Sequence, residues 1–221
     1  MGRTRAPKRK EPGDYHHGDL RRALLDAALA IIVESGPESF SVREAARRVG
    51  VDHRAAYRHF ADKDTVLATL AQEGYEGILH TWRASLERIP EDHVHHRLLT
   101  LGRALVEFAY REPGRYRVMT GPRLNEGGRF PELEVPIDAA FTLLQDEFRA
   151  GIARGALRRI DVIEGALTLW SAMHGLASLI IMRRIRVRKD QLGAFAERAI
   201  GSTVRGLEVP APHAARMIRS E

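Results

Sequence analysis

The 221-residue sequence predicts an all-α protein, and three observations support this fold class. Apolar residues recur at intervals of three and four along most of the chain, which is the spacing of one helix face. Strand-like alternation of apolar and polar residues is scarce. Pairs such as Gly36-Pro37 and Pro113-Gly114 separate the periodic segments, as helix-breaking residues do.

The composition narrows the class of protein further. Hydrophobic residues make up 44% of the chain, as in globular proteins, and there is no cysteine. Disulfides, thiolate metal sites and cysteine nucleophiles are therefore excluded. No apolar run approaches the ~18 residues expected of a membrane helix, and no signal sequence is apparent. We expect a cytoplasmic protein with no membrane partner.

The net charge of +6 is unevenly distributed. Residues 1–63 contain 13 Lys or Arg and 9 Asp or Glu, a balance of +4. Most of it lies in a basic arm that should not form a stable helix, because Pro7, Pro12 and Gly13 interrupt it. This arm is either a solvated tail or a flexible element that reaches a DNA minor groove or phosphates. Its cations are Arg3, Arg5, Lys8, Arg9 and Lys10.

Four helices are expected in the first third of the chain. Asp19 can cap a helix that continues to Gly36-Pro37. Ser41 and Glu44 have capping-box spacing, and Gly50 can end the short helix that they begin. A third segment covers residues 52–60. A fourth helix begins at residues 62–64 and runs to about Arg88, a length of about 40 Å.

The rest of the chain is also expected to be helical. Predicted helices cover residues 93–111, 114–119, 133–153, 161–184 and 189–207, with a loop at 121–132. The expected organisation is a disordered basic arm (1–15), a first helical domain (16–63), a second helical domain (64–208) and a flexible tail (209–221).

The segment 41–60, SVREAARRVGVDHRAAYRHF, has the spacing of a helix-turn-helix. Ala45 and Ala46 allow two helices to approach closely, and Gly50 permits a left-handed turn between them. Val51 and Ala56 can pack inward. Spacing alone leaves two alternatives open, a DNA-reading motif and an ordinary αα-hairpin.

The stretch from His16 to Leu67 resembles the DNA-binding domain of TetR-family transcriptional regulators. The resemblance rests on GDLRRALLDAALAIIVESG, SVREAARRVGV and AAYRHFADKDTVLATL, above all on the Tyr57-x-His59-Phe60-x-x-Lys63 run. Further along, Trp170-Ser171-Ala172-Met173-His174-Gly175 is similar to the Trp-x-x-x-His-Gly motif of one class of TetR C-terminal domain. The resemblance implies that residues 16–63 are a three-helix, helix-turn-helix DNA-binding domain and that residues 64–208 are a helical bundle for effector binding and dimerisation.

The resemblance also implies DNA contacts. The family's DNA-contacting positions correspond here to Ser41, Arg43, His53, Arg54, Tyr57, His59 and Lys63. Ser41 would bond a phosphate at a helix N-terminus, and Lys63 would reach one as a point charge. Arg43 suits the O6 and N7 atoms of guanine, and His53 and Arg54 are further base-reading candidates.

Several of these positions have a structural alternative. Tyr57 is either a backbone contact or a core ring packed on the first helix, and His59 either contacts DNA or only caps and packs. Arg47 and Arg48 are expected to be solvated or paired with Glu44. Where the family often has a hydroxyl, this chain has Ala55 followed by Ala56, which places the operator sequence in question but not DNA binding.

TetR-like proteins bind palindromic double-stranded operator DNA as homodimers, with recognition helices about one DNA turn, roughly 34 Å, apart. We expect a stripe on the last helix to contribute to the dimer interface, together with the 161–182 helix; the alternative is a monomeric bundle core. The stripe consists of Leu192, Phe195, Ala196, Ala199, Ile200 and Val204.

Family members also bind a small molecule among the middle helices. The effector here is unidentified, and a mainly apolar pocket would suit a hydrophobic or aromatic compound. Trp170 and His174 share a helix face, and His174 either lines the pocket or only packs. The expected lining is Trp82, Leu101, Leu105, Phe108, Met119, Phe141, Trp170, Met173 and His174.

The sequence predicts no cofactor, metal site or enzymatic activity. The histidines of Asp92-His93-Val94-His95-His96 lack a helical H-E-x-x-H pattern, and no P-loop or nucleophile elbow is present. The predicted function is a regulator, most simply a repressor, that an effector releases from its operator. The alternatives are a helical small-molecule-binding protein and a dimeric scaffold, neither of which binds DNA.

Overall fold

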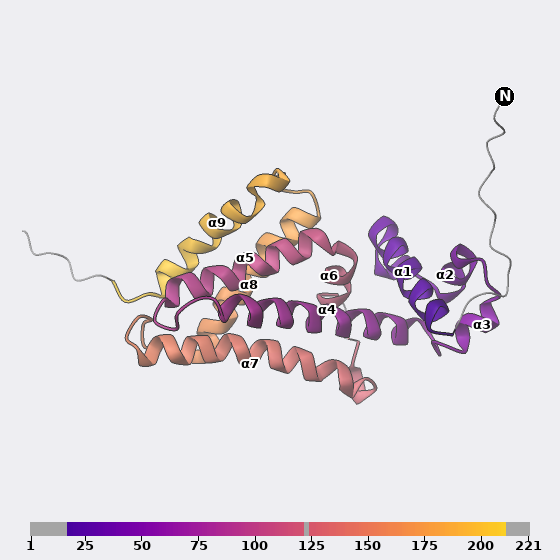
Figure 1. The fold of residues 1–221 in the computed structure, drawn as a ribbon, viewed down its shortest axis with the longest axis horizontal. Coiled ribbons are helices and arrows are strands. Elements are labelled where there is room, and N and C mark those ends of the chain that lie inside the picture. The colour runs from indigo at the N-terminus through magenta and orange to yellow at the C-terminus, as the bar shows by residue number, and fades with distance from the viewer. Residues whose placement is uncertain (1–16, 122–123, 211–221) are drawn as a thin grey trace, which may run out of the picture. The chain divides into compact units, whose positions relative to one another are not determined.

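The computed structural model describes residues 17–121 and 124–210, and these ranges form helices with no β-strand (Figure 1). The chain divides into two compact units. The first contains the residues up to Gly74 together with Gly114–Glu134. The second contains Tyr75–Pro113 and the residues from Val135 onward. The all-α prediction is confirmed.

The first unit contains the predicted helix-turn-helix. Its elements are α1 (His17–Ser35), η1 (Pro37–Ser39), α2 (Val42–Val49), α3 (His53–Tyr57), the first half of α4 (Lys63–Leu86), α6 (Pro113–Met119) and η2 (Glu126–Gly128). The Ser41 hydroxyl accepts a hydrogen bond of 3.2 Å from the Glu44 N–H, and Gly50 has φ 80° and ψ 29°. The Asp52 carboxylate caps α3 by accepting from the Arg54 N–H at 2.7 Å. Local capping chemistry therefore fixes both ends of the turn.

Small residues let the three N-terminal helices pack closely. Ala45, Ala46 and Ala56 expose 2% of their surface or less, and α2 contacts both α1 and α3. The side chains of Leu25 and Ile32 on α1 are equally buried. The alanines thus form the packed inner side of the motif, which leaves the outer side of α2 and α3 to longer residues.

Helix α6 is fixed to the end of α1. The Arg117 guanidinium donates to the Ile32 and Val33 carbonyls at 3.1 and 3.0 Å. These carbonyls belong to the last turn of α1, where helical donors run out, although the Ile32 carbonyl also accepts from the Gly36 N–H at 2.9 Å. Arg115 donates to the Glu73 carboxylate at 3.0 Å. The first unit therefore includes α6 as well as the three N-terminal helices.

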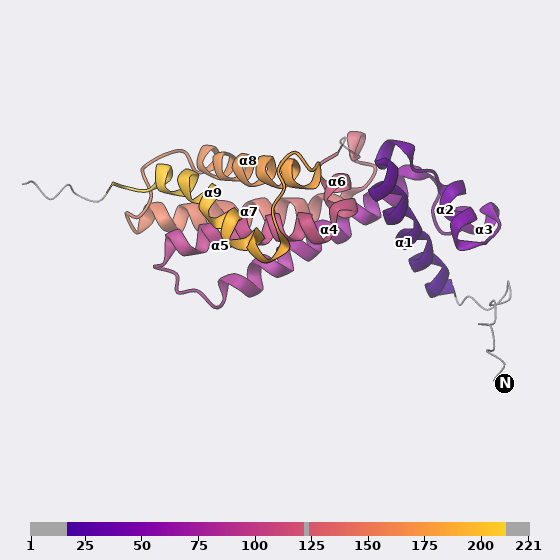
Figure 2. The same ribbon diagram turned by 90° about the horizontal axis from the view of Figure 1, so that it is seen from above.

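The second unit is a helical bundle (Figures 1 and 2). It contains the second half of α4, α5 (Val94–Arg111), most of α7 (Pro131–Ala153), α8 (Val162–Ile181), η3 (Lys189–Gln191) and α9 (Leu192–Leu207). Helix α5 contacts both α8 and α9. A Cβ on Gly102 of α5 would lie 2.8 Å from the Ile200 Cδ1 atom of α9, so glycine permits this close approach.

Three predicted boundaries differ from the structure. Helix α8 ends at Ile181 because Arg183 takes a left-handed conformation, with φ 57°. The predicted helix at 189–207 is divided into η3 and α9. Pro131, expected in a loop, is the first residue of α7, a position where its missing N–H costs nothing. Among the described residues, no helix is long and apolar enough to cross a membrane.

Candidate nucleic-acid interface

Three arginines on the helix-turn-helix are exposed and have no side-chain partner in the part of the chain that the structure describes. Arg43 lies in the first turn of α2, Arg54 in α3, and Arg58 directly after α3. An exposed guanidinium without a carboxylate partner keeps all its donors for a ligand. These side chains can therefore supply both charge and directed hydrogen bonds to DNA.

The other two arginines of α2 are held by carboxylates. Glu44 accepts from Arg47 at 2.8 and 2.7 Å and from Arg48 at 3.1 Å. Arg48 also donates two hydrogen bonds to Glu34 of α1, at 2.9 and 2.6 Å. These arginines, Arg47 first, lower the pKa of Glu44 to about 2. The prediction that both pair with Glu44 is confirmed.

This pairing explains how an electrically neutral segment can present cations on one face. Residues 13–63 hold 8 Lys or Arg and 8 Asp or Glu. The described acidic groups lie mainly in contacts away from Arg43 and Arg54: Asp26 pairs with Arg22 at 2.6 Å, and Asp62 pairs with Arg129. The carboxylates thus neutralise one set of arginines and leave the other set free.

The aromatic side chains of α3 lie on its outer side. The Tyr57 ring is 41% exposed and meets the His53 ring edge-on, with 6.5 Å between the ring centroids. Tyr57 is therefore not a core ring packed on α1. His59 is half-buried just beyond the helix. His53 and Tyr57 form a rigid pair beside Arg54, suited to contact a sugar-phosphate backbone.

Ser41 and Lys63 lie at helix N-termini, and each has a structural partner. The Ser41 oxygen accepts the Glu44 N–H, but its own hydroxyl hydrogen stays available to a phosphate. The Lys63 ammonium donates to the Glu38 carbonyl at 2.8 Å and so keeps two further N–H donors. Each can therefore act as both anchor and phosphate contact.

The basic arm of Arg3, Arg5, Lys8, Arg9 and Lys10 lies outside the described residues.

Arg58 is a candidate that sequence reasoning missed. It follows Arg54 by four residues, and this helical spacing is the signal that could have identified it. Ala56 is fully buried and cannot reach DNA, whereas Ala55 is half-buried. Of the two alanines, only Ala55 remains as a possible apolar contact to a base.

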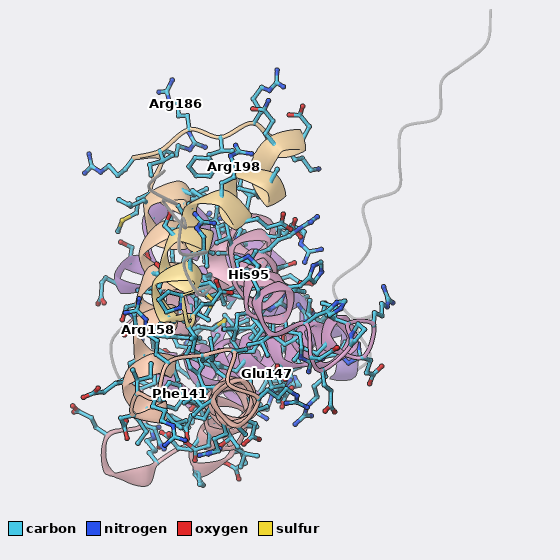
Figure 3. All side chains as sticks on the ribbon, turned by 90° about the vertical axis from the view of Figure 1, so that its left-hand side faces the viewer. His95, Phe141, Glu147, Arg158, Arg186 and Arg198 are labelled. Carbon is cyan, nitrogen blue, oxygen red and sulfur yellow. The ribbon has the colours of Figure 1, made fainter. Side chains whose placement is uncertain are left out.

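The residues expected around an effector lie in both units. Met119 belongs to the first unit, where its Sδ lies 2.5 Å from the place a Cβ on Gly74 would take. The other eight belong to the second. Trp82, fully buried, donates through Nε1 to the Leu101 carbonyl at 3.0 Å and meets Trp170 edge-on, with 6.4 Å between ring centroids. The remaining buried residues are Leu105, Phe108 and Met173; Phe141, labelled in Figure 3, Trp170 and His174 are half-buried.

A groove of about 980 Å³ lies elsewhere in the second unit. It is lined by the end of α4, the segment after it and the outer side of α7, and it includes none of the nine expected pocket residues. The ion pair between Arg97 and Glu147 is part of its wall. His174 lies on α8, 3.5 Å from the Ser178 hydroxyl, and burial lowers its pKa.

The predicted dimer stripe needs a correction. Leu192, Ala196, Ile200 and Val204 expose 4% or less of their surface, because they pack inside their own protomer. Only Phe195, half-buried, and Ala199, exposed, remain accessible. Helix α8 carries several exposed large apolar residues: Ile163, Leu167 and Leu179 are 51%, 47% and 44% exposed, and Met182, directly after the helix, is 66% exposed.

One histidine of the segment after α4 lies against a carboxylate. His95 Nδ1 lies 2.6 Å from the Glu208 carboxylate, at the end of α9. Beside it, Leu157 and Glu208 form an antiparallel bridge. Within residues 17–121 and 124–210, no group of three or more His, Asp or Glu side chains is placed to hold a metal ion. This segment joins α5 to the end of α9.

The chain resembles known regulators in both sequence and fold. Residues 24–70 match the family profile "Bacterial regulatory proteins, tetR family", and residues 98–203 match "Tetracyclin repressor-like, C-terminal domain". The nucleoid occlusion factor SlmA of Edwardsiella ictaluri (strain 93-146) is 30% identical over 179 residues, covering 77% of this chain and 88% of that protein. This protein therefore belongs to the TetR family of DNA-binding transcriptional regulators, whose members bind operator DNA and act as dimers.

Solved structures agree on the fold. A protein with unknown function from Rhodococcus sp. RHA1 matches with a TM-score of 0.73 and 26% identity, covering 90% of this chain and 100% of that chain. The ketosteroid transcriptional regulator KstR2 of Mycobacterium tuberculosis matches with a TM-score of 0.69, covering 86% and 95% of the two chains. Its 20% identity makes this a likeness of fold alone.

Proposed function

We propose that this protein is a dimeric repressor that reads a palindromic operator and releases it on binding a small molecule. The observation that carries this proposal is the separation of the arginines on the helix-turn-helix. Arg47 and Arg48 are paired, whereas Arg43, Arg54 and Arg58 are exposed and have no side-chain partner within residues 17–121 and 124–210. If this surface had only a structural role, we would expect carboxylates to pair with all of these arginines.

Each contact has a distinct role in this proposal. Arg43 and Arg54 read base edges, with Arg suited to bidentate contact with guanine. Ser41, Tyr57 and Lys63 bond phosphates and set the register of the motif, and His53 lies beside them. His59 and the basic arm add backbone contacts.

The effector acts by preferring one of two conformations. Helix α4 contributes residues to both units and is one of three places where the chain passes from one unit to the other. A ligand that favours the conformation with wrongly spaced motifs lowers operator affinity by its differential affinity. The edge-on ring pair of Trp82 and Trp170, which we name the aromatic cluster, suits a small hydrophobic or aromatic compound, and the half-buried Phe141 of α7 is a further candidate for the lining.

The central test is a gel shift with DNA from upstream of the protein's own gene. Wild-type protein should bind this DNA more tightly than a scrambled duplex, and both affinities should fall steeply with salt. Arg43→Ala should relax the preference at one base pair by about 1–3 kcal/mol. Arg47→Ala is the matched control on the same helix, because the Arg47 side chain is already occupied by Glu44. Equal losses in the two variants would remove Arg43 as a base reader.

Repression and release need separate measurements. A promoter fused to a reporter should be silenced by the protein, and activation would overturn the repressor assignment. The only two tryptophans, Trp82 and Trp170, both lie in the aromatic cluster, so intrinsic fluorescence can follow ligand binding. A compound that shifts this fluorescence and leaves operator affinity unchanged would not be an effector.

A second candidate function is nucleoid occlusion, the activity in the printed name of the SlmA relatives. The observation in its favour is the 30% identity over 77% of this chain. Chromatin immunoprecipitation separates the two candidates. A repressor should occupy one promoter or a few, whereas a factor acting across the nucleoid should occupy many dispersed sites.

A further inference from the structure

The connection between α8 and α9 concentrates positive charge to a degree that the proposed function does not explain. Residues 182–190 contain five Lys or Arg and one Asp, a balance of +4. Residues 64–221 as a whole balance at only +2, with 22 basic and 20 acidic residues. Without residues 182–190, the rest of this range therefore has a net charge of −2. We name residues 183–189 the basic connection.

The cations of the basic connection are mostly unpaired. Arg183, Arg184, Arg186 and Lys189 are exposed and have no side-chain partner among the described residues. Arg188 is paired with Asp190 at 3.1 Å, and both side chains are about 70% exposed. In the second unit, as in the first, carboxylates neutralise other arginines and leave this group to attract a polyanion.

The backbone of the connection directs these side chains outward. Beyond α8 the exposed Arg184, Arg186 and Arg188 alternate with the half-buried Ile185 and Val187. Arg184 and Ile185 belong to the turn that ends α8, since both N–H groups donate to the Leu179 carbonyl. Residues 186–188 then continue as a short extended segment, in which Arg186 and Arg188 share one side. In Figure 3, Arg186 lies at the upper margin of the second unit, and its side chain points away from the helices.

From this arrangement we infer that the basic connection is a second, sequence-independent contact site for the phosphate backbone of double-stranded DNA. This inference rests on the proposed function, because it assumes that the protein works on DNA. Contacts to phosphates need only charge and hydrogen-bond donors, which arginine supplies in a bidentate form.

The residue types favour DNA over other anionic partners. From Arg183 to Lys189 every exposed side chain is a cation, and the two apolar residues are turned partly inward. A protein partner would need apolar or aromatic anchors, and a membrane surface would need apolar side chains to insert. The exposed Met182 lies at the edge of the connection and continues the apolar face of α8. The connection itself presents neither kind of anchor.

Binding of a labelled non-operator duplex to the full chain tests this site. The triple variant Arg184→Gln/Arg186→Gln/Lys189→Gln should reduce the slope of log affinity against log salt by about 2–3, since each lost phosphate contact contributes about 0.9. The control Arg83→Gln/Arg88→Gln/Arg159→Gln removes three exposed cations of the same unit that have no side-chain partner in the described part of the chain. It should change the slope by less than about one. Equal changes in the two triples would overturn the site, because net charge alone would then account for both.

The absence of cysteine permits a local readout as well. A photo-crosslinker on Gln191→Cys, beside the connection, should attach to the duplex, and one on the exposed Ala153→Cys should not. Failure of Gln191→Cys to crosslink, or equal crosslinking by the two, would overturn the site. The triple variant is also compared with wild type in sedimentation with phosphatidylserine vesicles. If the variant loses vesicle binding but keeps its affinity for the duplex, the connection binds membranes instead and the DNA assignment is overturned.

The two proposals can fail separately. The ratio of operator to non-operator affinity tests the reading of sequence by the helix-turn-helix. The difference between the two triple variants on non-operator DNA tests the basic connection. Because this contact carries no sequence information, the connection triple should leave the operator ratio unchanged.

Discussion

Arg97 of α5 and Glu147 of α7 form a bidentate ion pair with two hydrogen bonds of 2.7 Å each. The side chains are only 11% and 15% exposed. Arg97 also donates to the Leu86 and Ile89 carbonyls at 3.0 and 2.6 Å, where α4 ends. One guanidinium thus joins three elements of the second unit, and Glu147 is the carboxylate that neutralises it in the wall of the groove.

Removing one partner of this pair should therefore be costly. Glu147→Ala leaves a buried, unpaired cation, and we expect the free energy of unfolding to fall by about 3–5 kcal/mol. The double variant Arg97→Met/Glu147→Leu replaces the pair with apolar groups and should recover much of that loss. Urea unfolding followed by circular dichroism measures both values. A double variant less stable than Glu147→Ala would show that the pair itself is strongly stabilising.

The pH dependence of the α2 network follows from the lowered pKa of Glu44, which Arg47 and then Arg48 bring from 4.5 to about 2. A carboxyl with a lowered folded-state pKa stabilises the protein above pH 4.5, and that contribution is lost as the pH falls toward 2. Glu44→Gln should weaken this acid-dependent loss. It should also free Arg47, whose printed carboxylate partner is Glu44, whereas Arg48 stays paired with Glu34. The salt dependence of non-operator DNA binding should then steepen by up to about 1 in slope, and an unchanged slope would show that Arg47 cannot reach DNA.

Local chemistry explains why the helix-turn-helix could be predicted from the sequence. Ser41, Gly50 and Asp52 determine helix ends through contacts within a few residues, so the pattern and the structure agree. The sequence did not predict in full which arginines of the helix-turn-helix are paired with carboxylates and which are not. The Arg48–Glu34 pair joins residues fourteen apart on two helices, and only the fold brings them together.

The role of the apolar stripe on α9, in contrast to the helix-turn-helix, could not be predicted from local sequence. An apolar stripe on a helix indicates that a face is buried but not against what. Gly102 lets α9 approach α5, and this packing uses the stripe inside the protomer. The apolar surplus of α8, also visible in the sequence, supplies the exposed face instead.

Burial lowers the pKa of His174 below its ordinary value of 6.5. A base with a lowered folded-state pKa takes up a proton more readily when unfolded, so stability is lost as the pH falls below 6.5. The wild-type urea midpoint should drop between pH 7.5 and 5.5, and His174→Gln should drop less. His80→Gln, at an exposed position, is the control and should behave as wild type. Equal drops in all three proteins would exclude His174 as the source.

Arg183 holds a left-handed conformation, with φ 57°, where helices usually end in glycine. This conformation costs a residue with a side chain about 1–2 kcal/mol. Glycine removes this cost, but part of the gain is offset because glycine has more conformational freedom in the unfolded chain. Arg183→Gly should therefore stabilise the protein by about 0.5–1 kcal/mol in urea unfolding. The same variant should lose affinity for non-operator DNA if the cation contributes to the basic connection. A variant that gains stability and keeps full affinity would remove Arg183 from that site.

The exposed apolar residues of α8 give the proposed dimer its most direct test. Leu167 and Leu179 are 47% and 44% exposed, and a partner's copy of the same face would bury them. Leu167→Glu/Leu179→Glu should place like charges across a two-fold interface and shift the protein to monomers in analytical ultracentrifugation. Val135→Glu introduces an acid at a site 68% exposed on α7 and should leave the dimer intact. A palindromic operator needs both recognition helices, so the α8 variant should also lose operator affinity, whereas its affinity for a single half-site should remain near that of wild type.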